Sequence, residues 1–470
     1  MPTPPTDLRA AFWLALADAA AAHAIMLRDA VIIDDAALES LLSAIDNARG
    51  SEVPVLAFVL LAGKLDDRID AGSAAGAAGA AQLGRGQMDL TMTALRLLVR
   101  EKLLVNLKSL DVFSQEMEVF AGMHAVTLVP VYANGVAIQA SSLGHVASAV
   151  IAALERGRGD LISALERINR GPLGAAASTG SGFPIDRERV AALLGFEGAI
   201  EQTFDALAGT DDFLAVAHAF EAVAAPTARW LDELVAIGRT EPTALALDES
   251  WQATDWAAPQ WGGSGGIAAL SVHGRKVIGT ARALASLATD LPWGPITAEV
   301  GAIIATIDEA ATALDVLFER ATALMRDTLI VNRAALANRA GRAFVTSADL
   351  ADFLIIEESI EPAPARAIAG IVLNRAREAG VEISGITPEM IDTAALMIIG
   401  REVKVEFEAI SRYLAPRRFI ERRNFAGGPS PAAVRSWLAG AESRRIADRA
   451  RVALIEGAIA EAVALRRSPS

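Results

Sequence analysis

Hydrophobic residues recur every three or four positions along much of this chain. Between residues 141 and 169 they stand at Leu143, Val146, Val150, Leu154, Leu161, Leu165 and Ile168. Positions with this spacing share one face of an α-helix. The pattern therefore predicts a long amphipathic helix over residues 141–169. Similar stripes predict two further long helices, over residues 88–120 and from Val300 to about Arg333.

Patterns typical of strands are scarce. Few runs alternate between apolar and polar residues, and the chain has two tyrosines in 470 residues. Long helical stripes without alternating runs between them are typical of a helical bundle or a helical oligomer. We predict an all-α fold with three helical domains: residues 1–84, a central long-helix bundle over residues 85–345, and residues 346–470. Thr346, followed three residues later by Asp349, predicts a capping pair where the third domain begins.

Composition excludes several kinds of chemistry. The chain has 57 acidic residues against 43 Lys and Arg, a formal net charge of −14. Because no basic tract offers a footprint for phosphates, we expect no nucleic-acid partner. The absence of cysteine and the lack of metal-ligand spacing among five histidines argue against a metal site. The glycine runs match neither GxGxxG nor GxxxxGK(S/T), so we expect no cofactor.

Two apolar stretches raise the question of a membrane. Residues 53–63, VPVLAFVLLAG, are too few to span a bilayer. Asp7 and Asp18 interrupt the apolar stretch near the N-terminus, and no charged leader precedes it. We expect a cytoplasmic protein with no membrane partner.

The segment that follows the predicted helix at 141–169 carries a recognisable motif. Residues 171–196 read GPLGAAASTGSGFPIDRERVAALLGF, and this segment resembles the one that follows a long core helix in argininosuccinate lyases. Four other segments resemble the same family in the same order: LGRGQMDLTMTALRL at 83–97, VPVYANGVAIQASSLGH at 129–145, TSADLADFLI at 346–355 and RRNFAGGPSPAAV at 422–434. The resemblance covers nearly the whole chain.

The resemblance implies a fold, an assembly and a reaction. The fold is that of the fumarase and aspartase superfamily, with three helical domains and a central five-helix unit. Four chains would form a homotetramer around a twenty-helix core, and each active site would collect segments from three subunits. The small-molecule substrate would undergo a β-elimination that releases fumarate. In the family, the base is a serine on a mobile Gly-Ser-Ser-x-Met-Pro-x-Lys loop.

In this sequence the family's loop falls on residues 254–266, within the region 251–266 of the central domain. Counted back without gaps from Leu291, the position of the basic serine is occupied by Asp255. A shifted register offers Ser264 instead, but it needs a compensating gap. Asp255 is therefore the first candidate base and Ser264 the second.

Tryptophans and glycines replace the charged residues of this loop. In the ungapped register, the family's two lysines fall on Trp261 and Gly262. If the loop closes over a substrate, Trp256 and Trp261 would cover it with apolar surface while the glycines act as hinges. A packed interface is the alternative explanation for these tryptophans.

The first motif keeps part of the family's helix start. Gly84, Arg85 and Asp89 match, while Gly86 and Met88 replace a serine and an asparagine that bind carboxylate. Arg85 fits two roles, a surviving carboxylate ligand or a partner in a structural salt bridge. Met88 would line the substrate site.

The second motif has lost its acid. Tyr132 and Gln139 match, but the family's Thr-His pair has become Ala133 and Asn134. Asn134 is either a hydrogen-bonding substitute for the histidine or a turn residue. Thr297 replaces the lysine that normally follows the Leu-Pro turn.

These departures leave three functional hypotheses. The first is a lyase-like enzyme whose substrate is less anionic than argininosuccinate. The second is a catalytically inactive homologue that acts as a scaffold or a partner of another protein. The third is an ordinary fumarate-releasing lyase with a different loop alignment. Losing one general acid or base costs roughly 10²- to 10⁴-fold in rate, so the changes argue against the ordinary reaction.

Overall fold

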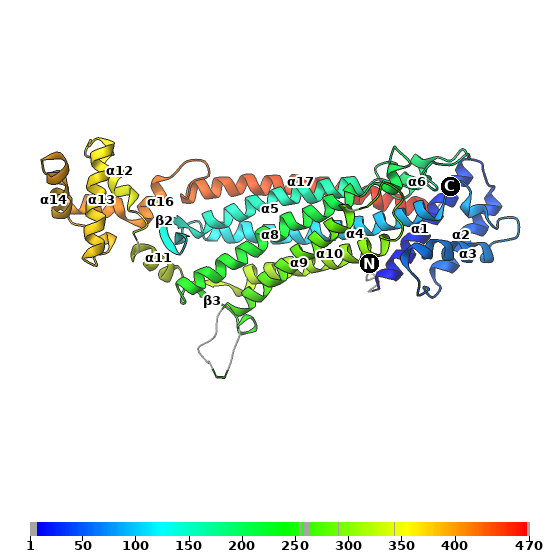
Figure 1. Ribbon diagram of the computed structural model, residues 1–470, viewed down its shortest axis with the longest axis horizontal. Helices are drawn as coiled ribbons and strands as arrows, with labels where there is room; N and C mark the ends of the chain where they lie inside the picture. Colours follow the sequence, from blue (N-terminus) through cyan, green and yellow to red (C-terminus); the bar gives the residue numbers. More distant parts are fainter. Residues whose placement is uncertain (1–6, 253–255, 258–263, 290, 343, 468–470) are drawn as a thin grey trace.

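The computed structural model describes residues 7–252, 256–257, 264–289, 291–342 and 344–467. Figure 1 shows an elongated molecule with a long-helix bundle in the middle. The N-terminal helices gather at one end of the bundle, and α12, α13 and α14 form a separate group at the other. The fold is all-α, as predicted, with two short antiparallel strand pairs among the described residues.

The N-terminal unit is built around one apolar helix. It contains α1 (Leu8–Asp29), α2 (Asp35–Arg49), α3 (Phe58–Gly72) and the short 3-10 turn η1 (Ala80–Gln82). By length and composition α1 is apolar enough to cross a membrane, but 78% of its most apolar window is buried inside the protein. Its Trp13 side chain is fully buried and donates a hydrogen bond to the carbonyl oxygen of Ala48 in α2. α1 therefore packs as a core helix.

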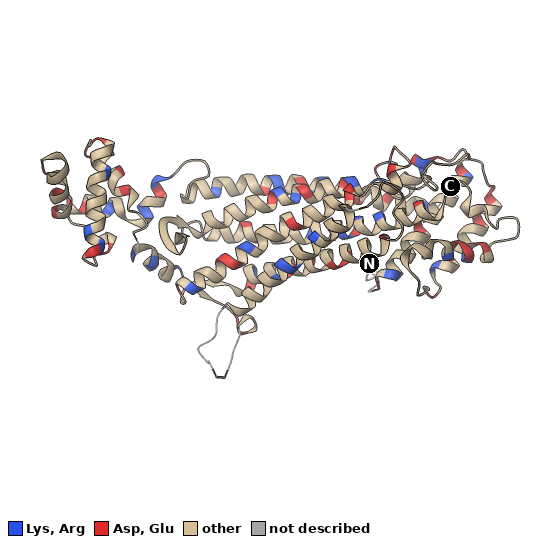
Figure 2. Cartoon of the chain, viewed as in Figure 1, with Lys and Arg blue, Asp and Glu red and all other residues tan. Residues whose placement is uncertain are grey.

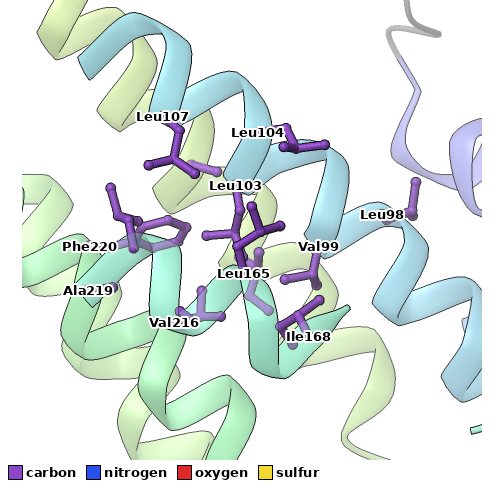
Figure 3. Close-up of a cluster of buried hydrophobic side chains, with 14 of the residues drawn as sticks. Leu98, Val99, Leu103, Leu104, Leu107, Leu165, Ile168, Val216, Ala219 and Phe220 are labelled. Atoms are coloured by element: carbon purple, nitrogen blue, oxygen red, sulfur yellow. The ribbon is translucent and has the colours of Figure 1, made fainter. Parts of the chain in front are cut away.

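Five long helices form the central bundle. They are α4 (Gln87–Met123), α5 (Leu143–Ile168), α8 (Asp211–Thr240), α9 (Gly265–Thr289) and α10 (Val300–Ala323). In Figure 3, Leu103 of α4, Leu165 of α5 and Phe220 of α8 belong to one cluster of buried side chains. The first two predicted helices are confirmed, and the Ser142 hydroxyl caps α5 by accepting the amide of His145 at 3.1 Å.

The third predicted helix is shorter than expected. α10 ends at Ala323, and a π turn over Leu324–Thr328 (η3) follows it. The chain then extends as β4 (Ile330–Val331), which pairs antiparallel with β3 (Leu245–Ala246). The prediction of a helix as far as Arg333 was therefore wrong, because residues 330 and 331 form a strand pair that helical spacing does not reveal.

The remaining elements connect or flank the bundle. Between α4 and α5 lies an antiparallel hairpin of β1 (Leu128–Ala133) and β2 (Val136–Ser142). Short helices and 3-10 turns link the long helices: α6 (Arg187–Leu193), α7 (Asp205–Ala208) and η2 (Glu249–Trp251). α11 (Arg333–Arg342) packs against β1 beyond the end of the bundle.

The C-terminal segment has a small core of its own. Its elements are α12 (Ala348–Ile356), α13 (Pro362–Glu378), η4 (Ile383–Gly385), α14 (Pro388–Ile399), α15 (Phe407–Leu414) and α16 (Pro416–Arg422). A cluster of buried side chains between Leu350 and Leu414 is separate from the bundle core. The long α17 (Pro431–Arg467) then runs back along α4 and α5 (Figure 1).

The expected capping pair at Thr346 is not formed by side chains. The Thr346 hydroxyl donates instead to the carbonyl oxygen of Leu414, at 2.8 Å. The Asp349 carboxylate is occupied by the guanidinium groups of Arg422 and Arg423. Long-range contacts have overridden the local signal, and they tie α12 to α15 and α16.

An apolar stripe on α4 faces solvent in the single chain. Val105, Val112 and Val119 are 48%, 43% and 50% exposed, and they stand seven residues apart on one helix face. A seven-residue apolar repeat is typical of a seam between packed helices.

Figure 2 shows that acidic and basic residues are interspersed over the molecule.

Candidate active site

The first motif lies where the N-terminal unit meets the bundle, and its arginine is engaged in an ion pair. The Arg85 guanidinium is fully buried and forms two hydrogen bonds with the Asp66 carboxylate of α3, at 2.5 and 3.3 Å. Asp66 is itself 3% exposed. Of the two roles expected for Arg85, the single chain displays the structural salt bridge.

Asp89 joins the first motif to the glycine-rich segment after α5. One carboxylate oxygen accepts the amides of Gly86 and Leu90 at 3.0 and 2.9 Å, which caps the start of α4. The other oxygen accepts the amides of Gly174 and Ala176 at 2.9 and 2.8 Å. Burial raises the pKa of Asp89 to about 6, although Arg85 and these backbone amides lower it. Asp89 therefore holds the two matching segments together.

Glycine is required at position 174. Its φ angle is +88°, and an added Cβ would lie 2.8 Å from the Arg187 side chain and 2.9 Å from Ile185. A larger residue would be strained both by its backbone conformation and by the lack of space. The Pro-Leu-Gly match in the sequence thus has a local structural cause.

Met88 and His23 complete this region. Met88 is partly buried and packs against the main core. His23 of α1 is fully buried, and its Nε2 lies 2.8 Å from the carbonyl oxygen of Leu83. Burial, with a smaller contribution from nearby Arg85, lowers the pKa of His23 to about 3, so the imidazole is neutral at physiological pH. No motif in the sequence indicated the roles of His23 or Asp66.

The second motif forms the β1–β2 hairpin. Asn134 and Gly135 occupy its turn with φ angles of +51° and +78°, the left-handed conformations that an Asn-Gly hairpin turn requires. Asn134 is exposed, which agrees with the role as a turn residue, and Gln139 is exposed on β2. The half-buried Tyr132 hydroxyl lies 3.2 Å from Arg339 Nε of α11, which donates to it. The Asn-Gly pair was the sequence signal for this hairpin.

The loop candidates are described only in part. Asp255 and Trp261 lie outside the described residues. Trp256 is 94% exposed, so in the single chain its side chain is not packed in an interface. Ser264 is half-buried, and its carbonyl oxygen accepts the amide of Ala268 in the first turn of α9, at 2.9 Å.

Thr297 lies in the segment between α9 and α10. Its neighbour Ile296 donates its amide to the carbonyl oxygen of Leu207 in α7, at 3.0 Å. This contact fixes the segment beside α7, and it leaves Thr297 half-buried.

One chain keeps these groups apart. Arg85 and Met88 stand at the start of α4, while the hairpin with Tyr132 and Asn134 follows its end. α4 has 37 residues, which at 1.5 Å per residue corresponds to roughly 55 Å. The candidate groups at the two ends of α4 therefore belong to different sites unless other chains bring them together. Within the described ranges, no group of three His, Asp or Glu side chains is arranged to hold a metal ion.

Comparisons with known proteins place the chain in a class of lyases. A family model described as "Lyase" matches residues 61–250. The chain is 25% identical over 468 residues to the argininosuccinate lyase of Methanosarcina barkeri, covering 96% of this chain and 91% of that protein. The argininosuccinate lyase of Methanosarcina mazei is 27% identical over 432 residues, with 89% and 84% covered.

Solved structures agree with this class. An EDDS lyase in complex with formate has a TM-score of 0.85 and 25% identity, covering 98% of this chain and 91% of that one. The class II fumarase of Schistosoma mansoni shares the fold at 13% identity, with a TM-score of 0.69 over 88% of this chain and 91% of that one. The chain belongs to the fumarase and aspartase superfamily, in which its similar relatives include carbon–nitrogen lyases.

Proposed function

We propose that the protein is a carbon–nitrogen lyase whose substrate is less anionic than argininosuccinate. The observation that carries this proposal is the Arg85–Asp66 ion pair. Arg85 is the one cation retained in the family's carboxylate-binding helix start, and its charge is already balanced by a buried carboxylate. Met88 and Gly86 beside it supply no charge. Such a site suits a substrate with fewer carboxylates than argininosuccinate. A substrate carboxylate placed here, in addition to that of Asp66, would lack a counter-charge.

The proposed reaction is a β-elimination. A base removes the proton from the carbon beside a carboxylate or carboxamide, the electron pair forms the C=C bond, and the C–N bond breaks. The amine leaves with a proton taken from an acid or from water. Asp255 is the proposed base, and Ser264 the alternative. Trp256 and Trp261 would cover the substrate, and the desolvation that follows would raise the pKa of the base toward neutrality.

The remaining candidates would line the same site from other chains. Asn134 and Gln139 are exposed on the hairpin, where a neighbouring chain can approach them. Tyr132 is oriented by Arg339, and Thr297 would face the substrate from the α9–α10 segment. A homotetramer around a twenty-helix core supplies such an arrangement. Two observations support it: the length of α4 between its two groups of candidates, and the exposed valine stripe along that helix.

The proposal is tested by running the elimination in reverse. The enzyme is mixed with a panel of primary amines and either fumarate or its monoamide, fumaramate, and loss of the conjugated alkene is followed by ultraviolet absorbance. We expect fumaramate to be consumed at least tenfold faster than fumarate. Fumarate consumed as fast as fumaramate would contradict the proposal and favour an ordinary fumarate-releasing lyase.

Two variants then assign the base. Asp255→Asn should reduce the rate by roughly 10²-fold or more, whereas Ser264→Ala should leave it within about threefold of the wild type. The opposite pattern would assign the base to Ser264. If both variants keep full activity, the loop carries no base.

A catalytically inactive scaffold is the second candidate function. The engagement of Arg85 by Asp66 favours it too, because the pairing removes a substrate-binding charge. Under this hypothesis no amine and acceptor pair reacts, and neither acceptor changes the thermal midpoint of the protein.

A further inference from the structure

A buried arginine outside the candidate active site lacks hydrogen-bond partners. Arg158 of α5 is 3% exposed. Its Nε and Nη1 atoms are buried without a hydrogen-bond partner within the described part of the chain. Its ion pair with Asp448 of α17 is long, at 3.7 Å. A buried guanidinium in this state costs free energy unless a further acceptor satisfies it.

Arg158 lines a cavity between α4, α5 and α17. The cavity measures about 370 Å³, within the range of small-molecule sites. Leu107, Ile162 and Val452 give it a buried apolar wall, and the exposed Ala453 stands at its edge. Polar groups thus occupy one side of the cavity and aliphatic groups another.

The acidic side chains around this cavity have partners of their own, apart from Asp448. Arg445 binds Asp111 at 3.1 Å and Glu118 at 3.1 Å. Lys108 pairs with Glu456 across the cavity edge. Asp448 makes only its long contact with Arg158 among the interactions of the described residues. The buried Arg158 cation and the adjacent Asp448 anion, whose side chain is 34% exposed, make no other ion pair among the described residues.

Charge balance restricts the kind of ligand that fits. The charged side chains at and around the cavity are Lys108, Arg158, Arg445 and Arg449, against Asp111, Glu118, Asp448 and Glu456. They balance, so an added anion or cation would leave a net charge in a partly enclosed site. A zwitterion leaves the balance unchanged. An α-amino acid carries its carboxylate and its ammonium on the same carbon atom, which suits the adjacent Arg158 and Asp448.

We propose that this cavity, the α4–α5–α17 cavity, binds an α-amino acid with an apolar side chain. The ligand carboxylate accepts from the forked Arg158 guanidinium, and its ammonium donates to Asp448. The aliphatic side chain lies against Leu107, Ile162 and Val452. None of these residues belongs to the candidate active site, so binding here is independent of the proposed elimination.

The test is calorimetric titration of the full-length protein with L-leucine, L-methionine and L-phenylalanine. Two fragments of leucine serve as matched probes: 4-methylpentanoate lacks the ammonium and 3-methylbutylamine lacks the carboxylate. We expect leucine to bind with a millimolar or lower Kd, and each of its fragments to bind at least tenfold more weakly than leucine. No heat from any of the three amino acids at about 10 mM, or fragments that bind as tightly as leucine, would overturn the proposal.

Two tryptophan variants locate the site without removing a buried charge. Ala453→Trp fills the exposed edge of the cavity, and we expect it to weaken binding at least tenfold. Ala439→Trp, at an exposed position on the same helix roughly 21 Å away, should leave the Kd unchanged. Arg158→Lys keeps the charge but loses the fork and should weaken binding about tenfold. Unchanged binding in Ala453→Trp would assign the heat to another site and overturn the proposal.

Discussion

Breaking the Arg85–Asp66 pair should destabilise the protein strongly, whereas replacing both residues should cost far less. The Arg85 side chain is 0% exposed and that of Asp66 4% exposed, so neither charge can be hydrated if its partner is removed. Removing one member of a buried pair typically costs about 3–5 kcal/mol, because an uncompensated charge remains. Replacing both members with apolar residues of similar size is often neutral or stabilising.

The measurement is a double-mutant cycle with Arg85→Met, Asp66→Leu and the double variant. Urea unfolding followed by far-ultraviolet circular dichroism gives each free energy of unfolding at a fixed protein concentration. We expect a coupling energy of about 3 kcal/mol or more. Lys64 and Asp67 on the same helix α3 provide the control, since their ion pair is 44% and 69% exposed. Its coupling should be below about 1 kcal/mol.

The outcome also bears on function. If the effects of Arg85→Met and Asp66→Leu on the free energy of unfolding add within about 0.5 kcal/mol, Arg85 does not depend on Asp66 as its ion-pair partner. Arg85 would then be free to bind a substrate carboxylate, and the substrate could be as anionic as argininosuccinate.

Three shorter predictions follow from neighbouring features. Asp89→Asn should cost about 2–4 kcal/mol in urea unfolding, because one amide oxygen cannot accept the four amides that the carboxylate accepts; a cost below 0.5 kcal/mol would contradict this. Since the pKa of His23 is lowered to about 3 when folded, the unfolded chain gains a proton first as pH falls, and stability should be lost between about pH 6.5 and 3. The His23→Gln variant should lose less stability than the wild type between these two pH values. An equal loss in the two proteins, measured by thermal denaturation, would refute the assignment of this pH dependence to His23. Val119→Asp should dissociate a homotetramer in light scattering, because it places a charge on the exposed stripe with Val105 and Val112; a wild-type monomer at micromolar concentration would refute the assembly.

The sequence predicted those parts of the fold that depend on local periodicity. The helices around residues 88–120 and 141–169 appeared close to their predicted bounds, because their apolar stripes are long and regular. The end of the third helix was missed, since the π turn at Leu324–Thr328 and the pairing of β4 with β3 are set by contacts distant in sequence.

The candidate site was predictable only where a motif residue also has a local structural role. Asp89 and Gly174 matched the family, and each has a clear local role in the described fold. Nothing in the pattern around Asp66 marked it as the partner of Arg85, because Asp66 lies in α3 and Arg85 lies 19 residues later, just before α4. The pair Asn134–Gly135 is typical of a hairpin turn. The strands on either side of it were not predicted, because the pattern of the chain is helical overall.

The central proposal is that this chain does not catalyse the ordinary reaction of its argininosuccinate lyase relatives. The most direct measurement is the turnover of argininosuccinate by the wild-type protein, followed by the ultraviolet absorbance of released fumarate. If Asp255, Asn134 and Gly262 replace the family's serine, histidine and lysine, as the ungapped register proposes, we predict no turnover at enzyme-like rates. Fumarate released at about 1 s⁻¹ or faster, within the usual range of enzymes, would contradict the claim.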